Sequence, residues 1–185
     1  MSIRILSHLL LSLALLAPVA AAAQKHGHGA GHGHHKTPYA GQQTREVKSL
    51  SAADLAEIRR GGGWGFALPA ELSGFPGPKH LLELRDELGL SARQVAAIEQ
   101  IFHGMQADAI AAGERFIAAQ QAVDAVFSAT APDGKRLRSA LQAAAAARAD
   151  LRFVHLSRHL ETGDLLTAGQ IEKYQILRGY APRPR

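Results

Sequence analysis

Apolar residues recur at alternating intervals of three and four positions through the middle of the chain, from Ala92 to about Ala129. This period places them along one face of an α-helix, as an unbroken a/d seam of the kind found in coiled coils. At 1.5 Å per residue, a helix of this length spans roughly 55 Å. The seam consists of Val95, Ile98, Phe102, Met105, Ala109, Ala112, Phe116, Ala119, Val123 and Val126.

Shorter helices are predicted before and after this long one, because Gly and Pro interrupt the helical pattern there. TAPDG ends the long helix and should turn the chain back, whereas GGGWGFALPAEL is either a loop or a loop followed by a short helix. The other predicted helices cover about Ser51–Arg60, Pro78–Gly89, Lys135–Thr162 and Thr167–Gly179.

These elements predict an all-α fold, an extended antiparallel helical hairpin with short flanking helices. A thin hairpin covers only part of its own apolar stripe, so we also expect a homodimer.

A short template occurs at the start of two of these helices, as LSARQV and LTAGQI. Ser or Thr acts as the N-cap, Gln three residues later reaches back to the cap's backbone amide, and the flanking aliphatic residues form a hydrophobic staple. A looser copy, LSAADL, precedes the first helix. The template therefore predicts helix capping rather than chemistry. Its residues are Leu90, Ser91 and Gln94 in the first copy and Leu166, Thr167 and Gln170 in the second.

The first residues resemble a secretory signal peptide rather than part of the fold. Arg4 precedes an apolar run, and Ala21–Ala23 supply small residues just before polar Gln24. An uncleaved anchor is the alternative, since Ile5–Ala23 is nearly long enough to span a membrane. Pro18 and the alanine run favour cleavage, and we expect a periplasmic protein.

Gly and His alternate in the segment that follows, which has no apolar face and is therefore expected to be disordered. The net charge of +5 is concentrated there, whereas the helical region is nearly neutral. An exported protein meets little nucleic acid, so we expect no nucleic-acid partner. The chain has no Cys, which excludes disulfides and thiolate metal sites. The expected segments are the signal peptide 1–23, the disordered leader 24–49, the helical domain 50–180 and the C-terminal tail 181–185.

Two L-[ST]-x-x-Q helix starts, one before the long seam and one before the last helix, resemble the CpxP/Spy family of periplasmic LTxxQ-motif proteins. The resemblance covers roughly Leu50 to Tyr180 and rests on LSARQ, LTAGQ, the signal peptide and the absence of Cys. It implies a curved, dimeric helical hairpin that either shields unfolded proteins without ATP or senses envelope stress and metals. The implied partners are unfolded or misfolded periplasmic proteins or an envelope sensor protein. The Gly/His leader and the GGGWG segment depart from the better-known members.

The leader carries five histidines within ten residues, and neutral imidazole binds Cu(II), Ni(II) and Zn(II). A merely solubilising leader is the alternative interpretation. No cofactor is required for the expected function, so these ions are candidate ligands only. The histidines are His26, His28, His32, His34 and His35.

A second candidate metal site follows from the hairpin. His155 and His159 are four residues apart and share a helix face. If TAPDG closes the hairpin, His103 lies one turn from both, with Glu99 a turn further along. The alternative is three ordinary histidines on solvated or half-buried faces.

No enzymatic motif is present: the chain has no G-x-S-x-G, no H-E-x-x-H and no phosphate-binding loop. Lys135, Arg136 and Arg138 form a basic cluster at the expected hairpin tip, where a solvated helix end is the simpler interpretation. Trp64, the only tryptophan, is expected to pack onto the helices. We therefore expect a non-enzymatic chaperone or stress adaptor, with a heavy-metal binding or sensing protein as the alternative.

Overall fold

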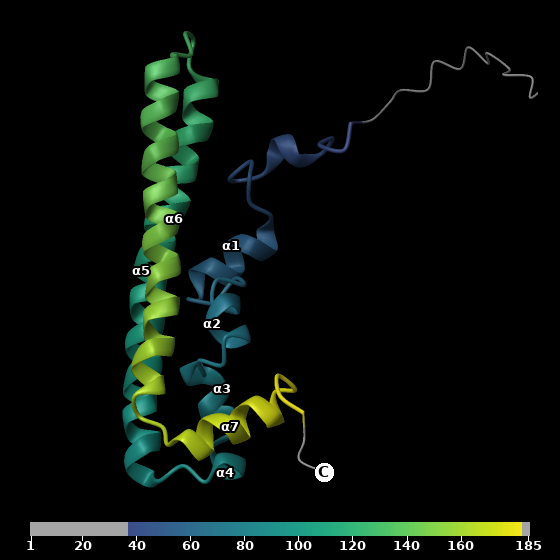
Figure 1. The fold of residues 1–185 in the computed structure, drawn as a ribbon. Helices are drawn as coiled ribbons and strands as arrows, with labels where there is room; N and C mark the ends of the chain where they lie inside the picture. Colours follow the sequence, from purple (N-terminus) through teal and green to yellow (C-terminus); the bar gives the residue numbers. More distant parts are fainter. Residues whose placement is uncertain (1–36, 183–185) are drawn as a thin grey trace, which may run out of the picture. The chain divides into compact units, whose positions relative to one another are not determined.

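A computed structural model describes residues 37–182 of the chain, and this part is helical with no strand. The all-α prediction is confirmed for these residues. Figure 1 shows the elements, which are η1 (Gln42–Thr44), α1 (Ala52–Arg59), α2 (Leu68–Leu72), α3 (Pro78–Glu83), α4 (Arg85–Leu88), α5 (Ala92–Ser128), α6 (Gly134–Gly163) and α7 (Ala168–Leu177). None of the described helices combines the length and apolar composition that crossing a membrane requires.

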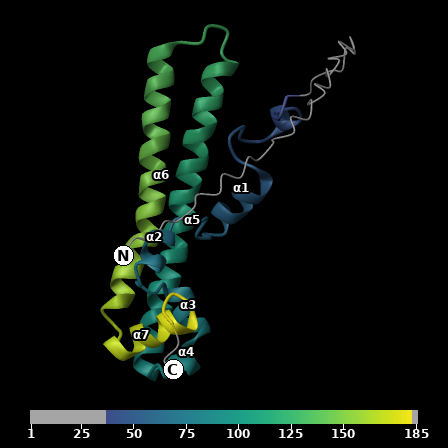
Figure 2. The same cartoon turned by 45° about the vertical axis from the view of Figure 1, so that its right-hand side comes forward.

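The two long helices, α5 and α6, lie side by side in both views (Figures 1 and 2). All ten positions of the apolar seam on α5 are buried or partly buried. The side chain of Asp133 caps α6 by accepting hydrogen bonds from the backbone amides of Lys135 and Arg136. The cap therefore marks where α6 begins, and the seam determines which face of α5 is buried.

The short helices pack along the α5–α6 pair. Helices α1 and α3 contact α5, α2 and α3 contact α6, and α7 lies beside α4 (Figure 2). The approach of α1 requires Gly113 on α5, because a Cβ there would lie 2.6 Å from Cγ2 of Ile58. The first apolar cluster consists of Val47, Leu50, Leu55, Ile58, Phe66, Ala109, Ala112, Phe116, Ile117 and Leu151, and the second of Leu81, Leu88, Ile98 and Tyr174.

Two sequence-based expectations differ from the structure. The helix expected over residues 78–89 is divided into α3 and α4 at Leu84, whose φ of −106° and ψ of 17° are not helical. Leu81 before the break and Leu88 after it belong to the same cluster, so the bend keeps both side chains buried. The folded region also begins before the predicted boundary at Leu50, because Val47 is fully buried and the Lys48 amide donates to Asp124 on α5.

Candidate functional site

A cavity of about 570 Å³ lies along α5 and α6 between the two apolar clusters. On α5 its wall includes Phe102 and Met105, which come after Ile98 of one cluster and before Ala109 of the other. Its remaining wall comes from the loop after α1, from α2, from the start of α3 and from the C-terminal end of the described chain. We call it the histidine cavity, after His155 and His159 of α6, which line it.

His155 is an almost completely buried histidine in this wall. Its exposed fraction is 2%, and its Nε2 atom has no hydrogen-bond partner among the described residues. Burial lowers the pKa of the imidazole below its usual value of 6.5, nearby His159 lowers it further, and a hydrogen bond with the Gly62 backbone opposes both. His155 is therefore a neutral imidazole at neutral pH, with a nitrogen that could still take a partner.

His159, one turn further along α6, is held by the loop before α3. Its Nδ1 lies 2.8 Å from the carbonyl oxygen of Phe75 and must donate the hydrogen bond, because a carbonyl can only accept. In the neutral ring this leaves the lone pair on Nε2. The Thr162 hydroxyl also holds this loop, because it donates a hydrogen bond to the Pro76 carbonyl at 2.6 Å. Gly77 allows this close packing, since a Cβ there would lie 2.6 Å from the imidazole ring.

Glu71 brings a buried carboxylate to the same cavity. Its exposed fraction is 7%, and its Oε2 accepts from the hydroxyls of Tyr174 at 2.6 Å and Tyr180 at 3.4 Å. Burial and then the hydrogen bond to Glu71 raise the pKa of Tyr174 well above its usual value of 10. The Tyr174 hydroxyl therefore remains protonated and donates to Glu71. The other carboxylate oxygen of Glu71, Oε1, lies 4.0 Å from Nδ1 of His159.

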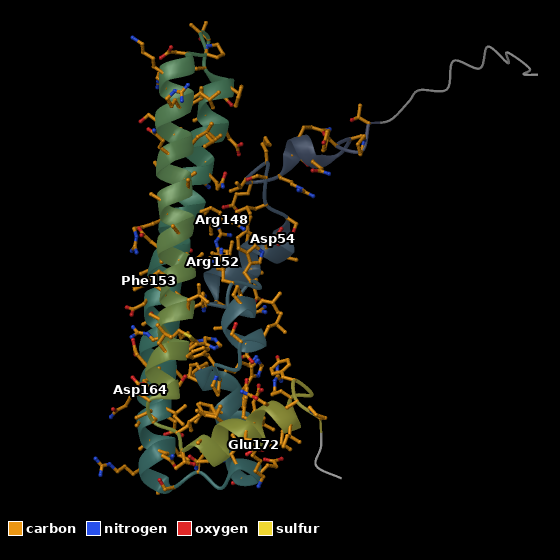
Figure 3. The ribbon with its side chains drawn as sticks, in the orientation of Figure 1. Asp54, Arg148, Arg152, Phe153, Asp164 and Glu172 are labelled. Carbon is orange, nitrogen blue, oxygen red and sulfur yellow. The ribbon has the colours of Figure 1, made fainter. Side chains whose placement is uncertain are left out.

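Trp64 occupies the glycine-rich part of the wall in a strained conformation. Its φ of 42° is unusual for a bulky residue, and such strain persists only where the surroundings enforce it. The indole Nε1 donates to Asp54 at 2.8 Å, and the Arg148 guanidinium lies over the ring at 5.6 Å from its centroid. Figure 3 labels Asp54 and Arg148. The hydrogen bonds from Ser51 and then from Trp64 lower the pKa of Asp54, so this carboxylate remains an acceptor. Trp64 thus packs onto the helices and also borders the cavity.

The structure brings together only part of the candidate metal set. His155 and His159 line one cavity, whereas His103 and Glu99 are exposed on α5. No cluster of three His, Asp or Glu side chains suited to a metal ion occurs within residues 37–182. The leader histidines, His26 to His35, lie outside the described residues.

The capping template has a further contact that its local pattern could not reveal. The structure contains complete capping boxes at Ser91 and Thr167, each closed by its glutamine. The two glutamines also bind each other, because the Gln94 side-chain amide donates to Oε1 of Gln170 at 2.8 Å and to the Leu165 carbonyl at 2.9 Å. The two helix starts are therefore joined, although their glutamines are far apart in the sequence.

Sequence reasoning missed Glu71 and Tyr174 as site residues. They meet across 103 positions of the chain, and neither belongs to a motif. The one available signal was Glu71 itself, an acidic residue in the otherwise apolar segment FALPAEL.

Comparison with known proteins gives no relative whose site residues could assign a role to these side chains. The arrangement offers two histidines and a carboxylate that accepts from two tyrosine hydroxyls, in a wall that combines apolar and charged side chains. Such a set can bind a ligand through a few placed polar groups. The family resemblance rests on the helix-start motifs, the absence of Cys and the expected signal peptide. Searches against protein-family models, curated proteins and solved structures find no match to this chain.

Proposed function

We propose that this protein is a periplasmic, non-enzymatic chaperone or envelope-stress adaptor of the CpxP/Spy type, which works without ATP. In this proposal a cleavable signal peptide exports it, and α5 and α6 form an extended antiparallel hairpin that pairs as a homodimer. Its partners are unfolded or misfolded periplasmic proteins or an envelope sensor protein. The observation that carries the proposal is a set of large apolar side chains left exposed on the long helices.

Phe153 on α6 is 70% exposed and is labelled in Figure 3, and Phe127 at the end of α5 is 65% exposed. Leu160 and Leu141 on α6 are 59% and 51% exposed. Arg152 is exposed on the same helix, so the surface of α6 carries cationic as well as apolar groups. A surface of this kind can hold unfolded segments of different sequence, because it offers apolar contact and charge without a fixed register.

The test is suppression of aggregation. A variant lacking His26–His35, added at stoichiometric ratio without nucleotide, should slow the aggregation of an unrelated unfolding protein as measured by light scattering. Replacing exposed apolar side chains by Phe153→Ser and Leu160→Ser should reduce this protection. Both are surface changes, so stability should move by no more than about 0.5 kcal/mol.

Ala149→Ser is the matched control, since Ala149 is exposed on the same helix and contributes little apolar area. The assay is run with a chelator and, in parallel, with Cu(II). Protection by the intact protein only with metal would refute the chaperone proposal. Full protection by the double serine variant would show that Phe153 and Leu160 do not form the client-binding surface.

A second candidate function, binding or sensing of Cu(II), Ni(II) or Zn(II), is favoured by one observation. His155 and His159 line the same cavity, and Nε2 of His155 has no partner there. Imidazole nitrogens bind these ions only when neutral. Calorimetry of the intact protein should then show binding near neutral pH, which is lost as the pH falls below roughly 6.

Deleting His26–His35 separates the two sets of histidines. We expect the deletion to remove most of the bound metal and the remainder to depend on His155 and His159. An unchanged stoichiometry after the deletion would show that the leader is not the chelator.

A further inference from the structure

Besides Nε2 of His155, two acceptor atoms in the wall of the histidine cavity lack a hydrogen-bond donor among the described residues. The first is Nε2 of His159, since Nδ1 of that ring donates to the Phe75 carbonyl. The second is Oε1 of Glu71, since Oε2 already accepts from the hydroxyls of Tyr174 and Tyr180. A Cβ on Gly77 would lie 2.8 Å from the first atom and 3.2 Å from the second, so the two acceptors are neighbours. Both side chains are more than nine-tenths buried. Neither atom is sealed from solvent, so a ligand in the cavity that donates two adjacent hydrogen bonds can reach both.

The rest of the wall indicates an aromatic ligand body. Trp64, Phe102 and Met105 supply aromatic and thioether surface, against which a ring can stack or pack. The volume of about 570 Å³ lies within the range of small-molecule sites, roughly 300–1,000 Å³. Solvent reaches the cavity, because Leu68 at its edge is 57% exposed. A single-ring molecule can therefore enter and be largely covered.

The charges around the cavity favour a neutral ligand. An anionic group beside the two acceptors would meet the carboxylate of Glu71. A cationic group would add to a wall whose charges already balance, since Arg60 is paired with Glu57, Lys79 with Glu83, and Arg178 lies near Glu71. Neutral hydroxyl groups avoid both costs and can donate to a carboxylate oxygen and to an imidazole nitrogen.

From these contacts we infer that the histidine cavity binds a neutral aromatic molecule with two neighbouring hydroxyl groups, a catechol. One hydroxyl donates to Oε1 of Glu71 and the other to Nε2 of His159, while the ring lies against Trp64 and Phe102. This site is independent of the apolar surface proposed to hold unfolded clients.

The fluorescence of Trp64 measures occupancy directly, because it is the only tryptophan in the chain. The intact protein is titrated with catechol, guaiacol and veratrole, which carry two, one and no hydroxyl donors on the same ring. A chelator is present throughout, so that a catechol–metal complex cannot account for the signal. We expect saturable quenching by catechol and a loss of roughly three- to tenfold in affinity for each donor removed.

Glu71→Gln supplies the protein side of the test. The tyrosine hydroxyls should hold the amide oxygen where Oε2 is now, which places a donor NH₂ group at the Oε1 position. In this variant, catechol should bind with no higher affinity than guaiacol. Gly77→Ala, which inserts a methyl group between the two acceptors, should weaken catechol binding as well. Circular dichroism and thermal melting show whether each variant folds.

The ligand series on the unaltered protein decides the inference even if a variant fails to fold. Absence of saturable quenching up to about 10 mM catechol, the weak end of specific binding, would overturn it. Equal affinity for catechol and veratrole would overturn it too, as would quenching that requires added metal. Retention of the catechol preference by folded Glu71→Gln would contradict the assigned donor–acceptor pair.

Discussion

The imidazole of His155 has little access to solvent and no partner at Nε2, so protonation would place a charge in a poorly solvated position. Its pKa in the folded protein is lowered from 6.5 by burial and by His159. Well above pH 6.5 the ring is neutral in both the folded and the unfolded chain, and this site does not make stability depend on pH. As the pH falls below 6.5, the unfolded chain binds a proton that the folded chain resists, and stability decreases.

We therefore predict that His155→Phe weakens the loss of stability between pH 7.5 and pH 5. The variant removes both the titrating group and an unpaired polar atom while keeping a ring in the wall. Urea unfolding at both pH values measures the effect. His103→Gln is the control, because it removes an exposed histidine from α5. If His155→Phe has the same pH dependence as the unaltered protein, His155 is not the group responsible.

Single residues such as Glu71 show where prediction from sequence ends. Its role depends on Tyr174, Tyr180 and Gly77, which reach it only after the helices have packed. No local period or spacing encodes such a contact. His155 and His159 could be placed on one face from their spacing, but their burial depends on the loop before α3.

At the scale of helices, much more follows from local chemistry. The seam on α5 and the three capping boxes depend on residues within a few positions of each other, so the sequence predicts them directly. The break at Leu84 and the burial of Val47 could not be predicted in this way, because both follow from contacts with distant helices. The same distinction applies to Gln94 and Gln170, whose capping role is local and whose mutual hydrogen bond is not.

We predict that Gln94→Glu destabilises the protein by about 1–2 kcal/mol, although a carboxylate still accepts from the Ser91 amide. The substitution removes the donors to Leu165 and Gln170. A negative charge in the first turn of α5 offsets part of this loss through the helix dipole. Chemical denaturation measures the change, and Gln100→Glu on the exposed face of α5 is the control with the same charge difference. A Gln94→Glu variant as stable as the parent would show that the link between α5 and α7 contributes nothing.

At the scale of the described chain, stability is expected to be unevenly distributed along α5 and α6. The first apolar cluster joins α1 to both long helices, and the second joins α3, α4 and α7 to the start of α5. The histidine cavity separates the two. Beyond the first cluster, towards the turn at residues 129–133, α5 buries only Val126 and α6 only Ala144. Segments with few buried contacts open at lower free energy.

Hydrogen exchange measured by mass spectrometry should therefore be fastest near the turn, intermediate around the cavity and slowest within the two clusters. Phe116→Ala, at a cost of about 3–5 kcal/mol, should raise exchange in α1 and in the centre of α5 more than in α7. Ile98→Ala, at about 2–5 kcal/mol, should do the reverse and act mainly on α3, α4 and α7. Both residues are fully buried on the same helix, so each serves as the control for the other. An even rise in exchange across all helices in both variants would show instead that α5 couples the two clusters into a single cooperative unit.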